Sequence, residues 1–409
     1  MNQVDKIKVA LDIEGQKYDV GTLAKDGRQI YFKYVDTFLG TNLSLSPIRL
    51  SFSNQIQKVN TDVFEGIFGV FWDSLPDGWG RLLQDKYIQS LGINLNKIGA
   101  LERLSMVGDH GPGALTYRPA MDESGQKNNT IGKLWDVYAS VLKINETHDD
   151  GDLWSIYKLG GSSGGARPKI NCKYSENRDV LYFDNASYHE DTTDWIIKFP
   201  SSLDLKDIAH IEYAYFLMAR ECGLTISDSR LFYAKVDTWF FGTKRFDRTD
   251  REKKHFVSAA GIMHDNYRLS NLDYGHLMDC TFRLEKNHSS LEKVFRLACF
   301  NVLMHNKDDH SKNFGFLMDG LGHWEFSPCY DLTFSKTTHG YQSTSVLGIS
   351  KNITEYDLKK LGKEFGIDNA SMIIEQVKDV RAHWRQYAKD SNVSTSSTKM
   401  IENIFTTKQ

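Results

Sequence analysis

Short runs in which apolar and polar residues alternate open the chain, and such runs predict β-strands. Glycine and Asp-Gly pairs separate them, as is typical of turns between antiparallel strands, so we expect a meander or a small barrel. More strand-like runs follow in the middle of the chain, and one of them is strongly apolar. Together the pattern predicts strands over residues 6–13, 17–22, 29–35, 167–173, 195–200, 229–235 and 238–244.

Apolar residues at helical spacing follow these strands. One helix is predicted over residues 207–222, and Gly223 is a residue type that commonly ends a helix. A nearly continuous apolar run over residues 291–304 predicts a buried helix. After Arg248 the pattern is mainly helical, so the chain is expected to be an α+β protein. Two further helices are predicted over residues 80–91 and 132–145.

The polar, turn-rich segment 119–130 marks a domain boundary. We therefore expect three parts, with residues 1–118, 119–245 and 246–409. Two glycine-rich stretches lie in the first part, at residues 71–80 and 106–115. Each is either a tight structural turn or a binding loop, and the sequence leaves both interpretations open.

Composition narrows the class of protein. The 409 residues carry a net charge of −3, so no global basic field points to direct nucleic-acid binding. No apolar run is long enough to cross a bilayer, and the first residues lack the core of a signal peptide. We expect a cytoplasmic protein with no membrane partner. The five cysteines are widely spread with no CxxC pair, which favours buried thiols over a zinc site or disulfides.

The strongest chemical signal follows the apolar helix. Asp308 precedes Asn313 by five positions, the spacing between the catalytic Asp and a metal-binding Asn in protein kinases. A hairpin is predicted around Asp319-Gly320, and Asp331 comes after it, where a second metal ligand belongs. The Asp–Asn spacing alone is also common in turns. The ordered set of helix, polar loop, hairpin and acidic loop favours phosphoryl transfer from ATP with Mg²⁺.

Other residues near this signal fit the same chemistry. Lys312 adjoins Asn313 and is expected to neutralise the transferring phosphoryl group, while His310 is expected to face the nucleotide. Upstream, Lys198 lies in the apolar strand 195–200, where its ammonium group needs a partner such as the ATP phosphates. Alternatively, Lys198 is an edge-strand lysine whose amine reaches solvent. Glu212 either pairs with Lys198 or is solvated.

A glycine-rich loop at residues 159–165 comes before Lys198. Gly164 and Gly165 would let the backbone approach phosphate oxygens, although the loop matches neither common nucleotide-binding glycine pattern. Its serines, Ser162 and Ser163, are candidate phosphorylation sites. The alternative is that residues 159–165 form a flexible surface loop with no role in nucleotide binding.

Farther along the sequence, Phe246 either lies near the adenine at a hinge or belongs to a packed linker.

These motifs, in this order, resemble those of the HipA family of kinase toxins from bacterial toxin–antitoxin operons. The early pieces Leu75–Gly80 and Gly108–Leu115 are similar to its N-terminal subdomain. The later pieces resemble its kinase motifs: Gly164–Lys169, Ile197–Phe199, Arg245–Arg248, Asp308–Asn313 and Tyr330–Leu332.

The resemblance implies a two-lobed, protein-kinase-like fold, with a strand-rich N-terminal lobe, an extra N-terminal subdomain and an all-helical C-terminal lobe. It implies that Asp308 is the catalytic Asp, that Asn313 and Asp331 bind Mg²⁺, and that Lys198 contacts the ATP phosphates. Phe246 and His310 would line the nucleotide site. Lys244 stands where some relatives have an acidic residue, so a side-chain contact to adenine there is in doubt.

The resemblance also implies regulation and partners. Ser162, or the adjacent Ser163, would be autophosphorylated, which ejects the loop and silences the kinase. Relatives phosphorylate aminoacyl-tRNA synthetases and are restrained by a HipB-like DNA-binding antitoxin, through which they meet DNA only indirectly. Two other functions remain open: a catalytically silent nucleotide-binding module that acts through the antitoxin and DNA, and a kinase for a lipid or small molecule.

Overall fold

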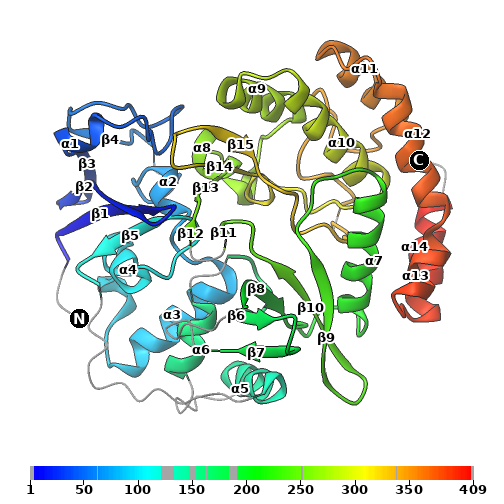
Figure 1. Ribbon diagram of the computed structural model, residues 1–409, viewed down its shortest axis with the longest axis horizontal. Coiled ribbons are helices and arrows are strands. Elements are labelled where there is room, and N and C mark those ends of the chain that lie inside the picture. The colour runs from blue at the N-terminus through cyan, green and yellow to red at the C-terminus, as the bar shows by residue number, and fades with distance from the viewer. Residues whose placement is uncertain are drawn as a thin grey trace. The chain divides into compact units, whose positions relative to one another are not determined.

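The computed structural model describes residues 4–61, 63–120, 133–146, 153–161, 164–183, 191–249, 252–337 and 339–406. The chain forms two compact units (Figure 1). The first comprises Met1–Ser201, Phe232–Val257 and Leu317–His323. The second comprises Ser202–Leu231, Ser258–Phe316 and Trp324–Gln409.

The first unit begins with an open sheet in the order β4-β3-β2-β1-β5. Side chains of β1 alternate between buried and exposed, the period that one buried sheet face requires. The meander of the first strands is confirmed, and β5 joins it by pairing antiparallel with β1. The strands are β1 (Lys6–Ile13), β2 (Gln16–Asp26), β3 (Gln29–Tyr34), β4 (Gln57–Lys58) and β5 (Leu115–Arg118).

A second sheet, in the order β7-β6-β8-β10-β9, follows in the chain. It is the strand-rich part predicted from residues 167–244. In its centre, Lys198 of β8 lies directly opposite Lys169 of β6 and Phe241 of β10. The strands are β6 (Lys169–Ser175), β7 (Val180–Tyr182), β8 (Thr193–Lys198), β9 (Ser229–Lys235) and β10 (Thr238–Lys244).

Helices α3 (Gly78–Ser90) and α6 (Leu153–Gly160) pack beside this second sheet (Figure 1). One buried cluster joins Trp79 and Leu83 of α3, Tyr157 of α6 and Ile170 of β6. The early chain therefore shares a hydrophobic core with the sheet that carries Lys198. The remaining helices of the first unit are α1 (Asp36–Leu39), α2 (Gly69–Trp72), η1 (Leu95–Lys97), α4 (Ala100–Val107) and α5 (Leu134–Glu146).

The second unit is mainly helical, as predicted. Its central helix α10 buries most of its side chains, which explains the long apolar run in the sequence. The helices are α7 (Ile208–Glu221), α8 (Ala259–Met263), η2 (Tyr267–Leu269), α9 (Tyr274–Glu285), α10 (Ser289–Leu303), η3 (Ser311–Asn313), α11 (Glu355–Glu364), α12 (Ala370–Ala382), α13 (Trp384–Asp390) and α14 (Thr395–Thr406).

An all-helical C-terminal part was too strict an expectation. A three-stranded sheet, β13-β14-β15, contains the predicted hairpin around Asp319-Gly320, and two short strands precede it. Gly315–Met318 is entirely buried, so its apolar side chains carry no alternation that would separate strand from helix. The strands are β11 (Arg248–Thr249), β12 (Glu252–Lys253), β13 (His255–Ser258), β14 (Gly315–Met318) and β15 (Trp324–Phe326).

Candidate active site

The polar loop predicted to carry catalysis, residues 306–313, begins directly after α10. The Tyr215 hydroxyl donates to the carbonyl of Met304 at 2.6 Å. The next residue, His305, adopts a left-handed backbone conformation with φ 58°, which stops the helix. The chain therefore turns sharply at a buried, hydrogen-bonded point before the loop starts.

A buried polar network fixes the first half of this loop. Asn306 donates its amide to the Asn301 side chain at 2.9 Å, and Asn301 donates to the Tyr274 hydroxyl at 2.9 Å. Tyr274 in turn donates to the Asp309 carboxylate at 2.6 Å. Three of its members are each only 1% exposed: Asn301, Asn306 and Asp309. The hydrogen bonds of this network are therefore shielded from water.

Asp309 also binds a later segment of the chain, residues 343–344, to the loop. Its carboxylate accepts the backbone N–H groups of Ser343 and Thr344, at 3.0 and 3.1 Å. Burial raises the pKa of Asp309 to about 7, although hydrogen bonds from Tyr274, Gln342 and the two backbone groups act against that rise. Asp309 was not predicted from the sequence. The detectable signal was Asn301, a polar residue inside an apolar helix.

The residues predicted to bind metal, Asn313 and Asp331, belong to the same unit. The Asn313 side chain donates to the Asp308 carbonyl at 2.7 Å. The Tyr330 hydroxyl donates to the Lys312 carbonyl at 2.7 Å, which joins the residue before Asp331 to the residue before Asn313. Asp331 itself has φ 57°, a conformation uncommon outside glycine and short polar residues. The structure therefore brings the Asp308–Asn313 loop and the Asp331 loop together.

The remaining loop side chains surround Tyr267. The Lys312 amine lies 5.2 Å from the centre of the Tyr267 ring, and the His310 ring lies 5.5 Å from it. His310 Nε2 is 3.9 Å from an Asp308 carboxylate oxygen, and the Asp308 side chain is 65% exposed. An acceptor hydroxyl can thus reach Asp308 from solvent, as the predicted role requires.

Ser335 supports the loop from the segment after Asp331. Its hydroxyl accepts the backbone N–H groups of Lys307 and Asp308, at 2.7 and 2.9 Å. Its hydroxyl also donates to the Asn306 side chain at 3.3 Å. Nothing in the local sequence distinguishes this serine, because its partners are distant in the chain and are brought near by the fold.

In the first unit, the glycine-rich loop lies against basic side chains. Directly opposite residues on neighbouring strands point to the same face, so Lys169 and Lys198 form a pair of like charges. A side chain at Gly165 would meet the Lys169 amine, at 2.6 Å from its first carbon. The pair places two positive charges side by side on this face of the sheet. Lys169 was not predicted as a site residue. Lys198 also lies 5.6 Å from the centre of the Phe241 ring.

The Arg245–Arg248 motif joins distant parts of the first unit. Asp247 accepts from both guanidinium groups and from the Gly113 N–H at 2.8 Å. Burial alone would raise the pKa of Asp247, but Arg245 and Arg248 hold it below its usual range. Arg248 also donates to the Gly113 carbonyl at 2.9 Å. The stretch 106–115 is therefore held as a structural turn by this motif.

The other predicted site residues lie as follows. Phe246 contacts the Phe256 ring, with centres 5.6 Å apart. Glu212 is buried on α7 of the second unit, whereas Lys198 belongs to the first unit, and their pairing stays a prediction. Gly164 is exposed and Gly165 is half-buried. Ser162 and Ser163 lie outside the described residues.

The donor set suits Mg²⁺ held jointly with a nucleotide. Among the described residues, no group of three or more His, Cys, Asp and Glu side chains forms a metal cage. Mg²⁺ commonly takes only one or two protein carboxylates and completes its shell with phosphates and water. Asn313 and Asp331 supply the amide and carboxylate oxygens that this arrangement uses.

The described residues contain no helix that is long and apolar enough to cross a membrane.

Comparisons with known proteins converge on one family. The model of the HipA-like C-terminal domain matches residues 161–384, more than half of the chain, and the HipA N-terminal domain matches residues 11–118. A search among curated proteins gave no match.

Solved structures of related fold include two bacterial proteins. HipA in a complex with HipB and operator DNA, from Shewanella oneidensis MR-1, is 17% identical with a TM-score of 0.67. That match covers 98% of this chain and 95% of the other. The Helicobacter pylori proinflammatory kinase CtkA is 13% identical, with a TM-score of 0.30. That match covers 50% of this chain and 94% of the other.

Proposed function

Because the chain belongs to the HipA family, we propose that it is an ATP- and Mg²⁺-dependent serine/threonine protein kinase that acts as a toxin. The observation that carries the proposal is the joining of two loops in the second unit. Asn313 is bonded to Asp308, and Tyr330 is bonded to Lys312, so the loops bearing Asp308, Asn313 and Asp331 form one assembly.

In the proposed reaction, Mg²⁺ offsets negative charge on the nucleotide phosphates. Asn313 and Asp331 present oxygen ligands for that ion. The exposed Asp308 carboxylate accepts the proton of the acceptor hydroxyl, and Lys312 offsets charge on the transferring group. His310 and Phe246 line the nucleotide. In the first unit, Lys198 and the backbone of Gly164 and Gly165 would hold the phosphates, and Lys169 lies directly opposite Lys198.

The proposal is tested by labelling. The purified chain is incubated with radiolabelled ATP and Mg²⁺, alone and with a whole-cell lysate, beside Asp308→Ala and Asp331→Ala. We expect label on the chain itself, at Ser162 or Ser163, and on a lysate protein only with the unmodified chain. Equal labelling by all three chains would refute the catalytic assignment. Label in lipids or small molecules alone would make the chain a kinase of that class, and nucleotide binding without transfer would make it a silent module.

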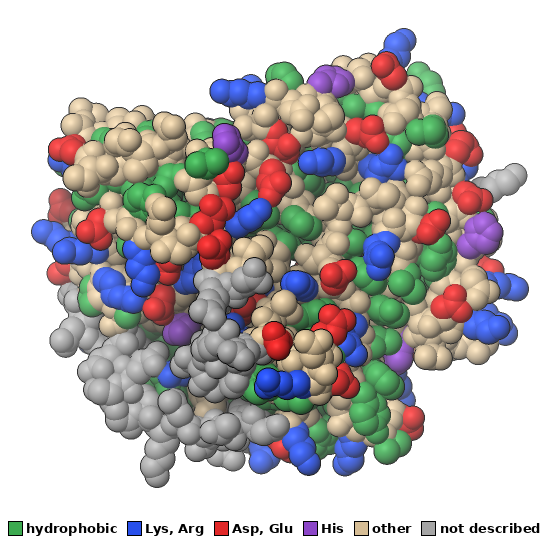
Figure 2. All heavy atoms as spheres, in the orientation of Figure 1, with side chains coloured by type: hydrophobic (Ala, Val, Ile, Leu, Met, Phe, Trp, Pro, Cys, Tyr) green, Lys and Arg blue, Asp and Glu red, His purple; other side chains and the backbone are tan. Residues whose placement is uncertain are grey.

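We propose an aminoacyl-tRNA synthetase as the protein substrate and a HipB-like antitoxin as the partner. The matched Shewanella oneidensis HipA forms a complex with HipB and operator DNA, which supports the second proposal. Figure 2 shows basic and acidic side chains interspersed over the described surface of the face that it draws. As part of the same proposal, DNA is met only through the antitoxin. Co-purification with a HipB-like protein encoded in the same operon tests this.

A further inference from the structure

The downstream end of the glycine-rich loop is held by the first turn of α3. The Gly165 N–H donates to the Asp77 carboxylate, and the Gly165 carbonyl accepts the Trp79 N–H at 2.9 Å. Between these residues, Gly78 has φ 44°, and a side chain there would collide with the Gly165 carbonyl. Asp77 occupies the N-cap position of α3, yet its side chain makes no capping bond to that helix. Its carboxylate is therefore directed to the loop.

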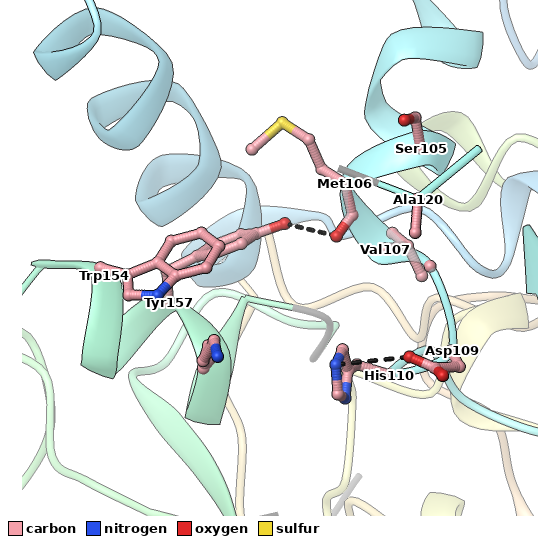
Figure 3. A pocket seen from close by; sticks show the side chains of 10 residues that line it. Ser105, Met106, Val107, Asp109, His110, Ala120, Trp154 and Tyr157 are labelled. Carbon is pink, nitrogen blue, oxygen red and sulfur yellow. Dashed lines mark hydrogen bonds and ion pairs between the residues drawn. The ribbon is translucent and has the colours of Figure 1, made fainter. Parts of the chain in front are cut away.

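The upstream end of the loop is held by the same early region. Helix α6 runs into the loop, and its Tyr157 donates to the Met106 carbonyl of α4 at 3.1 Å (Figure 3). The Tyr157 ring also stacks on Tyr87 of α3, with ring centres 5.6 Å apart. Helix α6 is thus fastened to two helices of the early chain before the loop begins.

Trp79 contacts both ends of the loop. Its backbone bonds to Gly165, and its indole nitrogen lies 3.1 Å from where a side chain on Gly160 would start. Trp79 is 2% exposed. Because one buried residue touches the beginning and the end of the loop, movement of α3 would shift both ends together.

We propose that the first turn of α3, residues 77–80, is the anchor of the glycine-rich loop, so that the HipA N-terminal domain sets how tightly the chain binds ATP. This rests on the proposed kinase function. It gives part of the stretch 71–80 a positioning role in nucleotide binding, although its sequence favoured a tight structural turn over a binding loop. Asp77 acts through the loop backbone and touches no nucleotide in this role.

The test compares Asp77→Ala, Asp77→Asn and Gly78→Ala with the unmodified chain. Asp77→Ala removes a charge-assisted bond, so KM for ATP should rise about ten-fold while kcat stays close to its original value. Asp77→Asn keeps an oxygen that accepts the Gly165 N–H and should restore most of the affinity. Gly78→Ala displaces the Gly165 carbonyl and should raise KM at least as much.

Hydrogen exchange gives a readout that needs no catalysis. In Asp77→Ala, amides of residues 160–169 should exchange several-fold faster, with helices α10 and α12 unchanged. The matched control is Asp85→Ala, on the same helix. Asp85 pairs with Arg103 at 2.6 Å, so this variant should lower the melting temperature without raising KM.

The outcomes separate the two proposals. An unmodified chain that fails to turn over ATP refutes the kinase function, whereas the exchange experiment still reports on the anchor. An active chain whose Asp77→Ala and Gly78→Ala variants keep both KM and loop exchange refutes the anchor. A rise in KM shared equally by Asp85→Ala would also refute it, because the effect would then follow general loss of stability.

Discussion

The catalytic loop and the glycine-rich loop are held in different ways. The catalytic loop, residues 306–313, is bonded along its length by buried groups such as Asn301, Tyr274 and Asp309, and by Ser335. The described ends of the glycine-rich loop are instead held by the early chain, through Tyr157 of the helix that leads into the loop and through Gly165. The first loop is thus held by a buried network in its own unit, and the second by the helices beside it.

This difference matches what each loop is proposed to do. A metal ligand and a proton acceptor act only when placed within a fraction of an ångström, so a rigid loop suits Asp308 and Asn313. A loop that covers phosphates must admit ATP and release ADP, which needs movement. We therefore expect catalytic-loop changes to act on rate and stability, and glycine-rich-loop changes to act on nucleotide affinity.

The largest effect is expected at Asp331, the proposed carboxylate ligand of Mg²⁺. Asp331→Ala removes a carboxylate that the other loop cannot replace, so kcat should fall by about three orders of magnitude. Steady-state ATP turnover measures this, with the exposed Asp368→Ala in the same unit as a control that keeps full activity. If kcat falls no further in Asp331→Ala than in Asp77→Ala, the two loops do not differ as proposed.

The sequence predicted the elements of both loops better than the bonds that hold them. Periodicity located the helices at 207–222 and 291–304, and the turn signal at Asp319-Gly320 located the hairpin, because these are local properties. Asp309 and Ser335 could not be found in this way. Their partners lie 34 and 28 residues away and are partly backbone groups, which carry no side-chain signature. Short buried strands such as Gly315–Met318 show no alternation of apolar and polar residues, so periodicity does not identify them as strands.

A large loss of stability is expected from Asp309→Ala. The change leaves the Tyr274 hydroxyl and the backbone N–H groups of Ser343 and Thr344 without their acceptor, in a region closed to water. Each unsatisfied buried donor costs roughly 1–3 kcal/mol, so unfolding free energy should fall by about 3 kcal/mol or more. Urea unfolding measures it. An unchanged midpoint would mean that the network does not hold the catalytic loop.

A smaller effect is expected on the pH dependence of stability. The raised pKa of Asp309, about 7 in the folded chain, means that folding favours its protonated form. Its contribution to stability is therefore complete below the unfolded-state pKa and is lost as pH rises through about 7. Between pH 5 and 7 the slope approaches roughly 1.4 kcal/mol per pH unit. In Asp309→Asn, which cannot titrate, this part of the slope should disappear from melting curves. Parallel curves for both chains would contradict the assignment.

The smallest effect is expected at Tyr330, where the Asp331 loop contacts the loop of residues 306–313. Tyr330→Phe removes one hydroxyl, which donates to the Lys312 carbonyl at 2.7 Å, and keeps the ring. A single neutral hydrogen bond contributes about 1 kcal/mol, so the Mg²⁺ concentration for half-maximal activity should rise a few-fold. The KM for ATP at saturating Mg²⁺ should change less. A matched change on the other loop, Tyr157→Phe, removes the bond to Met106 and should show the reverse order. If both variants shift the Mg²⁺ and ATP dependence equally, the two loops do not have the separate roles proposed for them.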